Sequence, residues 1–163
     1  MRALVLEGGG AKGAYQIGAW QLLRERKETF DIVTGTSVGA LNGALVVQGD
    51  FDAAYELWYH ASLDQIVAGQ PELLDKLVNS QVNTQDYRSV MAYFKRIIGD
   101  KGLDITPLEA LLRKVIDEKK VRESQMRLGI VTVSLTDKKT LKLAIDHIPE
   151  GHLKDYLIAS LNM

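Results

Sequence analysis

The N-terminal part of the chain alternates short apolar runs with longer stretches of helical spacing. Ala3–Leu6 is a continuous apolar run that ends at glycines, which predicts a strand buried on both faces. A broad apolar face predicts a helix over Ala14–Arg26, and Phe30–Thr34 predicts a second strand. Val38–Val47 predicts a fully buried helix of small residues. Together these elements indicate a parallel βαβα unit with a right-handed crossover.

The middle of the chain is more polar and predicts mainly helices. One helix is expected to begin at Thr106, where Pro107 suits the first helical position and Glu109 completes a capping box. This helix is expected to run to about Lys119. Three earlier helices are expected over Ala53–Ala68, Glu72–Leu77 and Thr84–Ile98.

Two strand-like runs in the C-terminal part of the chain predict a hairpin. Leu128–Thr136 and Thr140–Ile145 are joined by the polar turn Asp137–Lys139, and the hairpin would extend the sheet. Leu153–Leu161 predicts a final helix. The pattern as a whole therefore indicates an α/β fold.

Composition changes this picture mainly by exclusion. A chain of 163 residues suits a single compact domain, and 46% hydrophobic with 25% charged residues is ordinary for a globular protein. A net charge of -1 provides no basic field, so we expect no nucleic-acid partner. The absence of cysteine excludes a disulfide framework and a thiolate metal site, and it fits a reducing cytosol.

No apolar run approaches the roughly 20 residues of a membrane-spanning helix. We therefore expect a cytoplasmic protein that contacts membranes only at their periphery. The aromatic side chains are expected to lie in the core rather than in a lipid-binding stripe. Those in question are Trp20, Trp58, Tyr55, Tyr59, Tyr93 and Phe94.

The residues that carry candidate chemistry gather in the predicted βαβα unit. Gly8, Gly10 and Gly13 satisfy G-x-G-x-x-G between a strand and a helix, which is the context of a dinucleotide-binding loop. That interpretation also requires an acidic residue at the end of the second strand. The second strand here leads into Thr34–Ser37, and its only acid, Asp31, lies at the wrong end.

Two other interpretations of the glycine loop lead in different directions. A phosphate-binding P-loop would need a lysine where Ala14 stands. An oxyanion-binding loop needs only backbone N–H groups, which consecutive glycines bring close to a ligand, and the positive end of the following helix dipole. Such a loop would stabilise a developing alkoxide. A nucleotide- or lipid-binding module without catalysis remains the alternative.

The segment Gly35–Gly39 reads G-x-S-x-G and lies between a strand and a helix of small residues. A nucleophilic serine needs this arrangement because it occupies a strained turn, where glycines two positions away keep neighbouring atoms clear. The turn presents Ser37 at the carboxyl end of the sheet, where ligands bind in α/β folds. The N–H of Val38 would then face the carbonyl oxygen under attack.

These two motifs together resemble the patatin-like phospholipase family. Gly8–Gly13 is similar to the family's G-G-G-x-[K/R]-G oxyanion loop. Gly35–Gly39, followed by Ala40–Ala44, is similar to its nucleophile segment. The resemblance is strong over residues 1–47, and it returns weakly at Tyr156–Ser160. Members of this family work with a Ser-Asp dyad and no histidine.

The resemblance implies a three-layer α/β sandwich with a mostly parallel central sheet flanked by helices. It implies hydrolysis of phospholipid or lysophospholipid acyl esters by Ser37, without a metal or a cofactor. The expected oxyanion hole comprises Gly8, Gly9, Gly10, Ala11 and Val38, and the residues that shape the loop and the turn are Gly13, Gly35 and Gly39.

The family's catalytic aspartate lies in a D-G-G or D-G-A motif, and this sequence contains no Asp-Gly pair. We therefore expect residues 1–163 to form a single but incomplete patatin-like domain, a piece of a longer enzyme. Its base would lie beyond Met163. A serine hydroxyl is a poor nucleophile until a neighbouring group takes its proton, so this chain by itself is expected to be inactive.

Histidine offers an alternative base. An α/β-hydrolase triad of Ser37, Asp137 and either His147 or His152 would have a permissible order along the chain. In that fold, however, the oxyanion loop and the serine turn do not follow the first two strands. We expect His147 at a strand end, His152 at the start of a helix and His60 partly buried on a helix, with none of them catalytic.

Overall fold

The structure of the chain, a computed structural model, describes residues 1–60, 106–134 and 136–161. The chain divides into two compact units. One unit comprises Met1–His60 with Arg113–Met163, and the other comprises Ala61–Leu112, of which residues 106–112 are described. The helices expected over Glu72–Leu77 and Thr84–Ile98 lie outside the described residues, and the helix expected over Ala53–Ala68 is observed as Phe51–Tyr59, ending at Tyr59.

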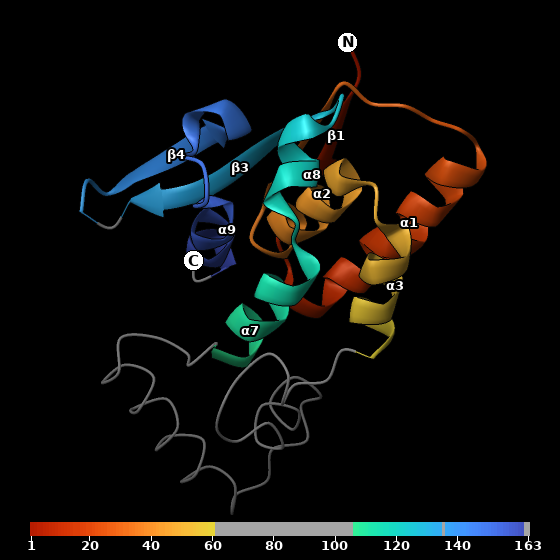
Figure 1. The fold of residues 1–163 in the computed structure, drawn as a ribbon, viewed down its shortest axis with the longest axis horizontal. Helices are drawn as coiled ribbons and strands as arrows, with labels where there is room; N and C mark the ends of the chain where they lie inside the picture. Colours follow the sequence, from red (N-terminus) through yellow and green to blue (C-terminus); the bar gives the residue numbers. More distant parts are fainter. Residues whose placement is uncertain (61–105, 135, 162–163) are drawn as a thin grey trace, which may run out of the picture. The chain divides into compact units, whose positions relative to one another are not determined.

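The first unit contains a four-stranded sheet with the order β1-β2-β3-β4 (Figure 1). The first three strands are parallel, and β4 pairs antiparallel with β3. The expected parallel unit and the expected hairpin are thus confirmed, as is the α/β class with a mostly parallel sheet and helices packed on it. The strands are β1 (Ala3–Leu6), β2 (Ile32–Thr36), β3 (Arg127–Ser134) and β4 (Lys139–Ala144).

The prediction that the first strand is buried on both faces is wrong. β1 lies at an edge of the described sheet, and its Val5 side chain is 72% exposed. Leu4 and Leu6 point to the opposite face and are half-buried. That face is the one α2 (Val38–Gln48) covers, because a Cβ on Gly43 would touch the side chains of Leu6, Val33 and Leu128.

The helix α2 is the centre of the unit. All its residues from Val38 to Val47 are buried, as its small and apolar sequence predicts. It contacts the three parallel strands as well as α1 (Gly13–Glu25), α3 (Phe51–Tyr59) and α9 (Leu153–Leu161). A short 3-10 turn, η1 (Gly10–Lys12), leads into α1. Burial on every side fixes the position of α2 relative to the sheet.

The helix expected to run from Thr106 to Lys119 ends earlier. α7 (Thr106–Val115) stops at Val115, and α8 (Glu118–Glu123) begins after Asp117. The side chain of Asp117 accepts hydrogen bonds from the N–H groups of Lys119 and Lys120, which caps α8. The side chain of Gln48 donates to the carbonyl of Val115 and accepts from the N–H of Asp117. A tertiary contact therefore satisfies the backbone where the helix breaks.

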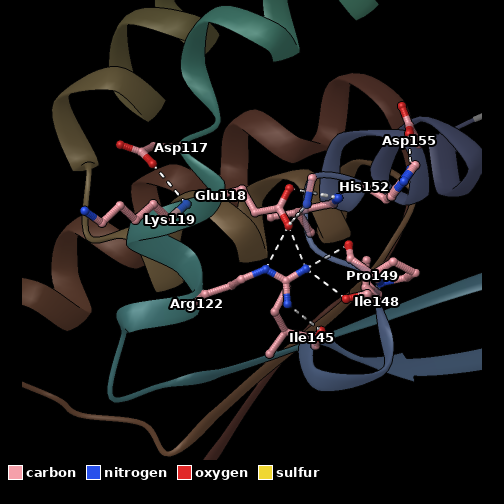
Figure 2. Close-up of polar contacts among 11 residues, drawn as sticks. Asp117, Glu118, Lys119, Arg122, Ile145, Ile148, Pro149, His152 and Asp155 are labelled. Atoms are coloured by element: carbon pink, nitrogen blue, oxygen red, sulfur yellow. Dashed lines mark hydrogen bonds and ion pairs between the residues drawn. The ribbon is translucent and has the colours of Figure 1, made fainter.

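Glu118 and Arg122 hold α8 to the segment that leads into α9 (Figure 2). The Oε1 atom of Glu118 accepts from Arg122 Nε at 2.8 Å and from the N–H of Gly151 at 2.9 Å, and its Oε2 accepts from the N–H of Leu153 at 3.1 Å. The guanidinium of Arg122 donates to three carbonyl oxygens of this segment, which includes the 3-10 turn η2 (Ile145–His147). These carbonyls belong to Ile145, Ile148 and Pro149.

Burial of Glu118 by itself raises the pKa of its carboxyl group, but the hydrogen bonds from Arg122, Gly151 and Leu153 outweigh it. The net result is a pKa below the ordinary value. Glu118 is therefore a charged acceptor at the N-terminal end of α9. The start of this helix is fixed to α8 by the hydrogen bonds that Glu118 accepts from the N–H groups of Gly151 and Leu153, while the ion pair with Arg122 lies within α8 itself.

The aromatic side chains divide between the core and the surface. Trp20 is buried and packs edge to face against Phe51. Tyr55 and Tyr59 stack on each other along α3 and are exposed, Tyr59 to 70%, so their expected place in the core is wrong. His60, expected to be partly buried, is exposed at the end of α3. The two tyrosines lie on the exposed side of this short helix, and His60 follows its last residue.

Within the described residues, no helix combines the length and the apolar character that crossing a membrane requires.

Candidate active site

Ser37 occupies the turn between the end of β2 and the start of α2. Its φ of 53° and ψ of -128° are strained for a residue with a side chain. A Cβ on Gly35 would collide with the backbone of Gly39, and a Cβ on Gly39 would collide with the carbonyl oxygens of Leu6 and Glu7. The turn therefore needs glycine on both sides of the serine, as the G-x-S-x-G arrangement requires.

The glycine loop after β1 passes directly against this serine. A Cβ on Gly8 would lie 3.2 Å from the Cβ and 3.9 Å from the Oγ of Ser37. Gly9 and Gly10 have positive φ angles of 151° and 54°, which only glycine adopts readily. The two segments meet because β1 and β2 are parallel neighbours whose carboxyl ends lie at the same edge of the sheet. Leu6 is the register partner of Gly35, and two residues further along each segment Gly8 lies against Ser37.

Five backbone N–H groups at this edge donate no hydrogen bond within the described part of the chain. They belong to Gly8, Gly9, Gly10, Ala11 and Val38. Val38 is the first residue of α2, so its N–H lies at the positive end of the dipole of that helix. Unbonded donors of this kind beside a serine hydroxyl can stabilise negative charge on a substrate oxygen.

A second serine supports the turn from the other end of the chain. The N–H of Ser37 donates to Ser160 Oγ at 2.8 Å, and this hydroxyl donates to the carbonyl oxygen of Val131 at 2.7 Å. Ser160 is 0% exposed. Sequence reasoning did not identify it as a site residue. The only signal was the weak return of the family resemblance at Tyr156–Ser160.

His147 and His152 do not lie beside Ser37. His147 follows β4, whose end pairs with Gly129 near the start of β3, whereas Ser37 follows the opposite end of the parallel neighbour β2. His152 precedes α9 and its Nδ1 lies 2.9 Å from Asp155 Oδ2. It is separated from Ser160 by the length of that helix, about 12 Å at the helical rise.

The remaining candidate of the histidine triad lies in the hairpin turn. Asp137 accepts a hydrogen bond from the hydroxyl of Ser134 at 3.0 Å. Among the described residues, the hydroxyl of Ser37 bonds to no carboxylate or imidazole. The structure thus brings the glycine loop and the serine turn together and separates the serine from His147 and His152. In the same part of the chain, no group of three or more His, Asp or Glu side chains is arranged as metal ligands would be.

Comparison with known proteins identifies a family model and several relatives. The family model described as Patatin-like phospholipase matches residues 4–163 of the chain. The lysophospholipase nte1 of Aspergillus terreus is 55% identical over 42 residues, which are 26% of this chain and 3% of that protein. The cUMP-AMP-activated phospholipase of Escherichia coli is 31% identical over 108 residues, which are 63% of this chain and 30% of that protein.

The solved structure of the type III effector protein ExoU has the same fold. It aligns with a TM-score of 0.55 and 18% sequence identity, covering 98% of this chain and 38% of that one. This chain therefore spans less than a third of the length of the two relatives above and well under half of this structure.

Proposed function

The chain belongs to the patatin-like phospholipase family, and on that basis we propose that it hydrolyses acyl esters of phospholipids or lysophospholipids with Ser37 as the nucleophile. Relatives named as a phospholipase and a lysophospholipase support a lipid ester as the substrate class. The observation that carries the proposal is the approach of Gly8 to within 3.2 Å of the Ser37 Cβ, measured from a Cβ built on the glycine. A loop of glycines is thereby held against a serine in a strained turn.

In the proposed reaction, the Oγ of Ser37 attacks the ester carbonyl carbon and its proton passes to a carboxylate base. The carbonyl oxygen becomes negatively charged and accepts hydrogen bonds from the N–H of Val38 and from the glycine loop around Gly9 and Gly10. Removing one such donor typically raises the barrier by about 3 kcal/mol, so each N–H group that meets the charged oxygen contributes substantially to the rate.

The adduct then expels the alcohol portion of the lipid, which takes the proton from the base, and the acyl group remains on Ser37. The same base takes a proton from water, which attacks the acyl carbon and releases the fatty acid. The proton returns to Ser37 Oγ. No metal or cofactor takes part in this scheme.

The base we propose is the aspartate of the family's Asp-Gly motif. No Asp-Gly pair occurs in the 163 residues, so this aspartate would come from sequence beyond them. The chain would then be catalytically incomplete by itself. Contact with the membrane would be peripheral, with the edge of the sheet that carries Ser37 facing the lipid.

Lipid hydrolysis by the full natural protein tests this proposal. Vesicles of phosphatidylcholine and micelles of lysophosphatidylcholine are offered separately to the wild type and to Ser37→Ala. We expect fatty acid release by the wild type and none by the variant. A module that only binds nucleotide or lipid through Gly8–Gly13 would release no fatty acid in either form and would bind a labelled dinucleotide or lipid saturably.

A further inference from the structure

Asn42 is a buried polar residue that the proposed mechanism does not use. It lies in α2, the helix that begins at Val38 directly after the nucleophile, and it is 1% exposed. Its Nδ2 donates to the carbonyl oxygen of Gly13 at 3.0 Å and to Gln16 Oε1 at 2.9 Å. Its Oδ1 accepts from the indole N–H of Trp58 at 2.8 Å. Both N–H groups of its amide and one lone pair of its amide oxygen are engaged.

The orientation of this amide follows from the chemistry of its partners. The indole N–H of Trp58 can only donate, so it must face the oxygen of Asn42. The carbonyl of Gly13 can only accept, so it must face the nitrogen. Neither aspartate nor an apolar residue could satisfy both partners, because one lacks the donor at neutral pH and the other lacks both groups.

Through these partners Asn42 holds both ends of the glycine loop. Gly13 is the residue at which the loop joins α1. Gln16, the second partner of Asn42, donates its Nε2 to the carbonyl oxygen of Glu7 at 2.8 Å, where the loop leaves β1. The loop residues 8–12 are therefore connected at their start and at their end to one buried side chain of the nucleophile's own helix.

The packing beside this network restricts the end of the loop at Gly13. A Cβ on Gly13 would collide with the rings of Trp58 and with the side chain of Val38. Trp58 therefore contacts the loop end and bonds Asn42 at the same time. Because the net stability gained from a buried hydrogen bond is small, the main consequence of such a network is a fixed geometry.

We propose that Asn42 is a positioning residue that sets the distance between the glycine loop and Ser37. It reaches no reacting atom. Its effect on catalysis rests on the proposed function, because it acts by holding the loop N–H groups where the charged oxygen develops. Displacing such donors by about 1 Å can reduce the rate by about 100-fold.

The test compares Asn42→Ala with Gln48→Ala in the full natural protein. Gln48 lies at the other end of the same helix, and its amide also makes two tertiary hydrogen bonds, to Val115 and Asp117. We expect Asn42→Ala to lower kcat by about 100-fold with KM changed less than about threefold. Gln48→Ala should lower the Tm about as much as Asn42→Ala does, but it should leave kcat at the wild-type value.

A second readout needs no activity. Hydrogen exchange at Lys12 and Gly13, whose N–H groups bond to carbonyl oxygens of the loop, should become at least about tenfold faster in Asn42→Ala and should be unchanged in Gln48→Ala. Gln16→Met, which removes the bonds to Asn42 and to Glu7 together, should show the same acceleration if Asn42→Ala does not fold. A folded Asn42→Ala or Gln16→Met protein with a lower Tm but with wild-type kcat and wild-type hydrogen exchange of the loop would overturn the proposal. A wild type without esterase activity would instead contradict the proposed function, while the exchange data would still decide whether Asn42 holds the loop.

Discussion

The backbone N–H of Ser37 donates a hydrogen bond of 2.8 Å to the hydroxyl of Ser160, although these residues are 123 positions apart. The single hydroxyl proton of Ser160 is directed at the carbonyl of Val131, so a lone pair faces the N–H of Ser37. One buried hydroxyl thereby joins α9, β3 and the strained serine turn.

Replacing Ser160 by alanine should impair catalysis as well as stability. The change leaves the N–H of Ser37 and the carbonyl of Val131 each without this buried partner, which should cost about 1–3 kcal/mol in the free energy of unfolding. The serine turn should also loosen, and kcat should fall by about tenfold or more. Urea unfolding and steady-state hydrolysis by the full natural protein measure the two effects.

Ser134 provides the matched control for this change. It is also a serine with a bonded hydroxyl, but its partner is Asp137 in the exposed hairpin turn. Ser134→Ala should leave kcat unchanged and alter stability by no more than about 0.5 kcal/mol. A folded Ser160→Ala protein with wild-type kcat would show that the bond to Ser37 has no part in positioning the nucleophile.

A methyl group on Gly8 should lower activity with little effect on folding. The φ of Gly8 is not in the left-handed region, so alanine suits its backbone, but the new Cβ would lie 3.2 Å from that of Ser37. One of the two must shift, and kcat should fall by about tenfold or more. Gly18→Ala is the control, because that glycine lies within α1 with nothing within 4 Å of its Cβ position. It should stabilise the protein by about 0.5–1 kcal/mol and leave kcat unchanged. Equal kcat values for the two variants would contradict the close approach of the loop.

The Glu118–Arg122 ion pair should make stability depend on pH in a defined direction. Because the folded-state pKa of Glu118 lies below its ordinary value of 4.5, its contribution is fully present above pH 4.5 and is lost as the pH falls through the folded-state pKa. Glu118→Gln should therefore be less stable than the wild type at pH 7 by about 1–3 kcal/mol. The difference in the free energy of unfolding between the two proteins should become smaller below pH 4.5.

Glu123→Gln is the control on the same helix. Glu123 pairs with Lys119 at 3.9 Å with both side chains largely exposed, so its removal should change stability by no more than about 0.5 kcal/mol. Denaturant titrations at several pH values measure both variants. If the stability difference between Glu118→Gln and the wild type stays constant down to pH 3, the carboxylate charge does not hold α8 to α9.

Residues 1–163 expressed alone should hydrolyse p-nitrophenyl butyrate at no more than the rate of its Ser37→Ala form. The physical reason is that a serine hydroxyl without a base is a poor nucleophile. Circular dichroism establishes that the chain is folded before the rates are compared. Turnover that depends on Ser37 would place the base within these residues, and the aspartates between residues 61 and 105 would be the first to replace.

Local patterns identified most of the elements of the first unit. The apolar run of β1, the small-residue helix α2 and the hairpin of β3 and β4 all depend on short stretches of sequence. Exposure on the second face of β1 was not predictable from them, because Val5 has the same apolar character as Leu4 and Leu6. What differs is that β1 is an edge strand with α2 packed on one face.

Long-range hydrogen bonds account for a second group of differences. The break between α7 and α8 depends on Gln48, which is 67 positions from Val115. The partners of Ser160 and Asn42 are likewise distant, and a serine or asparagine in an apolar helix carries no local sign of them. The two glycine motifs could be predicted because each needs its own backbone geometry, and that requirement is visible in the glycine spacing itself.

The most direct test of Ser37 as the nucleophile is the site of covalent modification. The full natural protein is treated with a fluorophosphonate probe, digested and analysed by mass spectrometry, beside Ser37→Ala as a control. We predict a single phosphonyl adduct on the peptide that contains Ser37, and none on the variant. An adduct on another serine, or equal labelling of Ser37→Ala, would contradict the assignment.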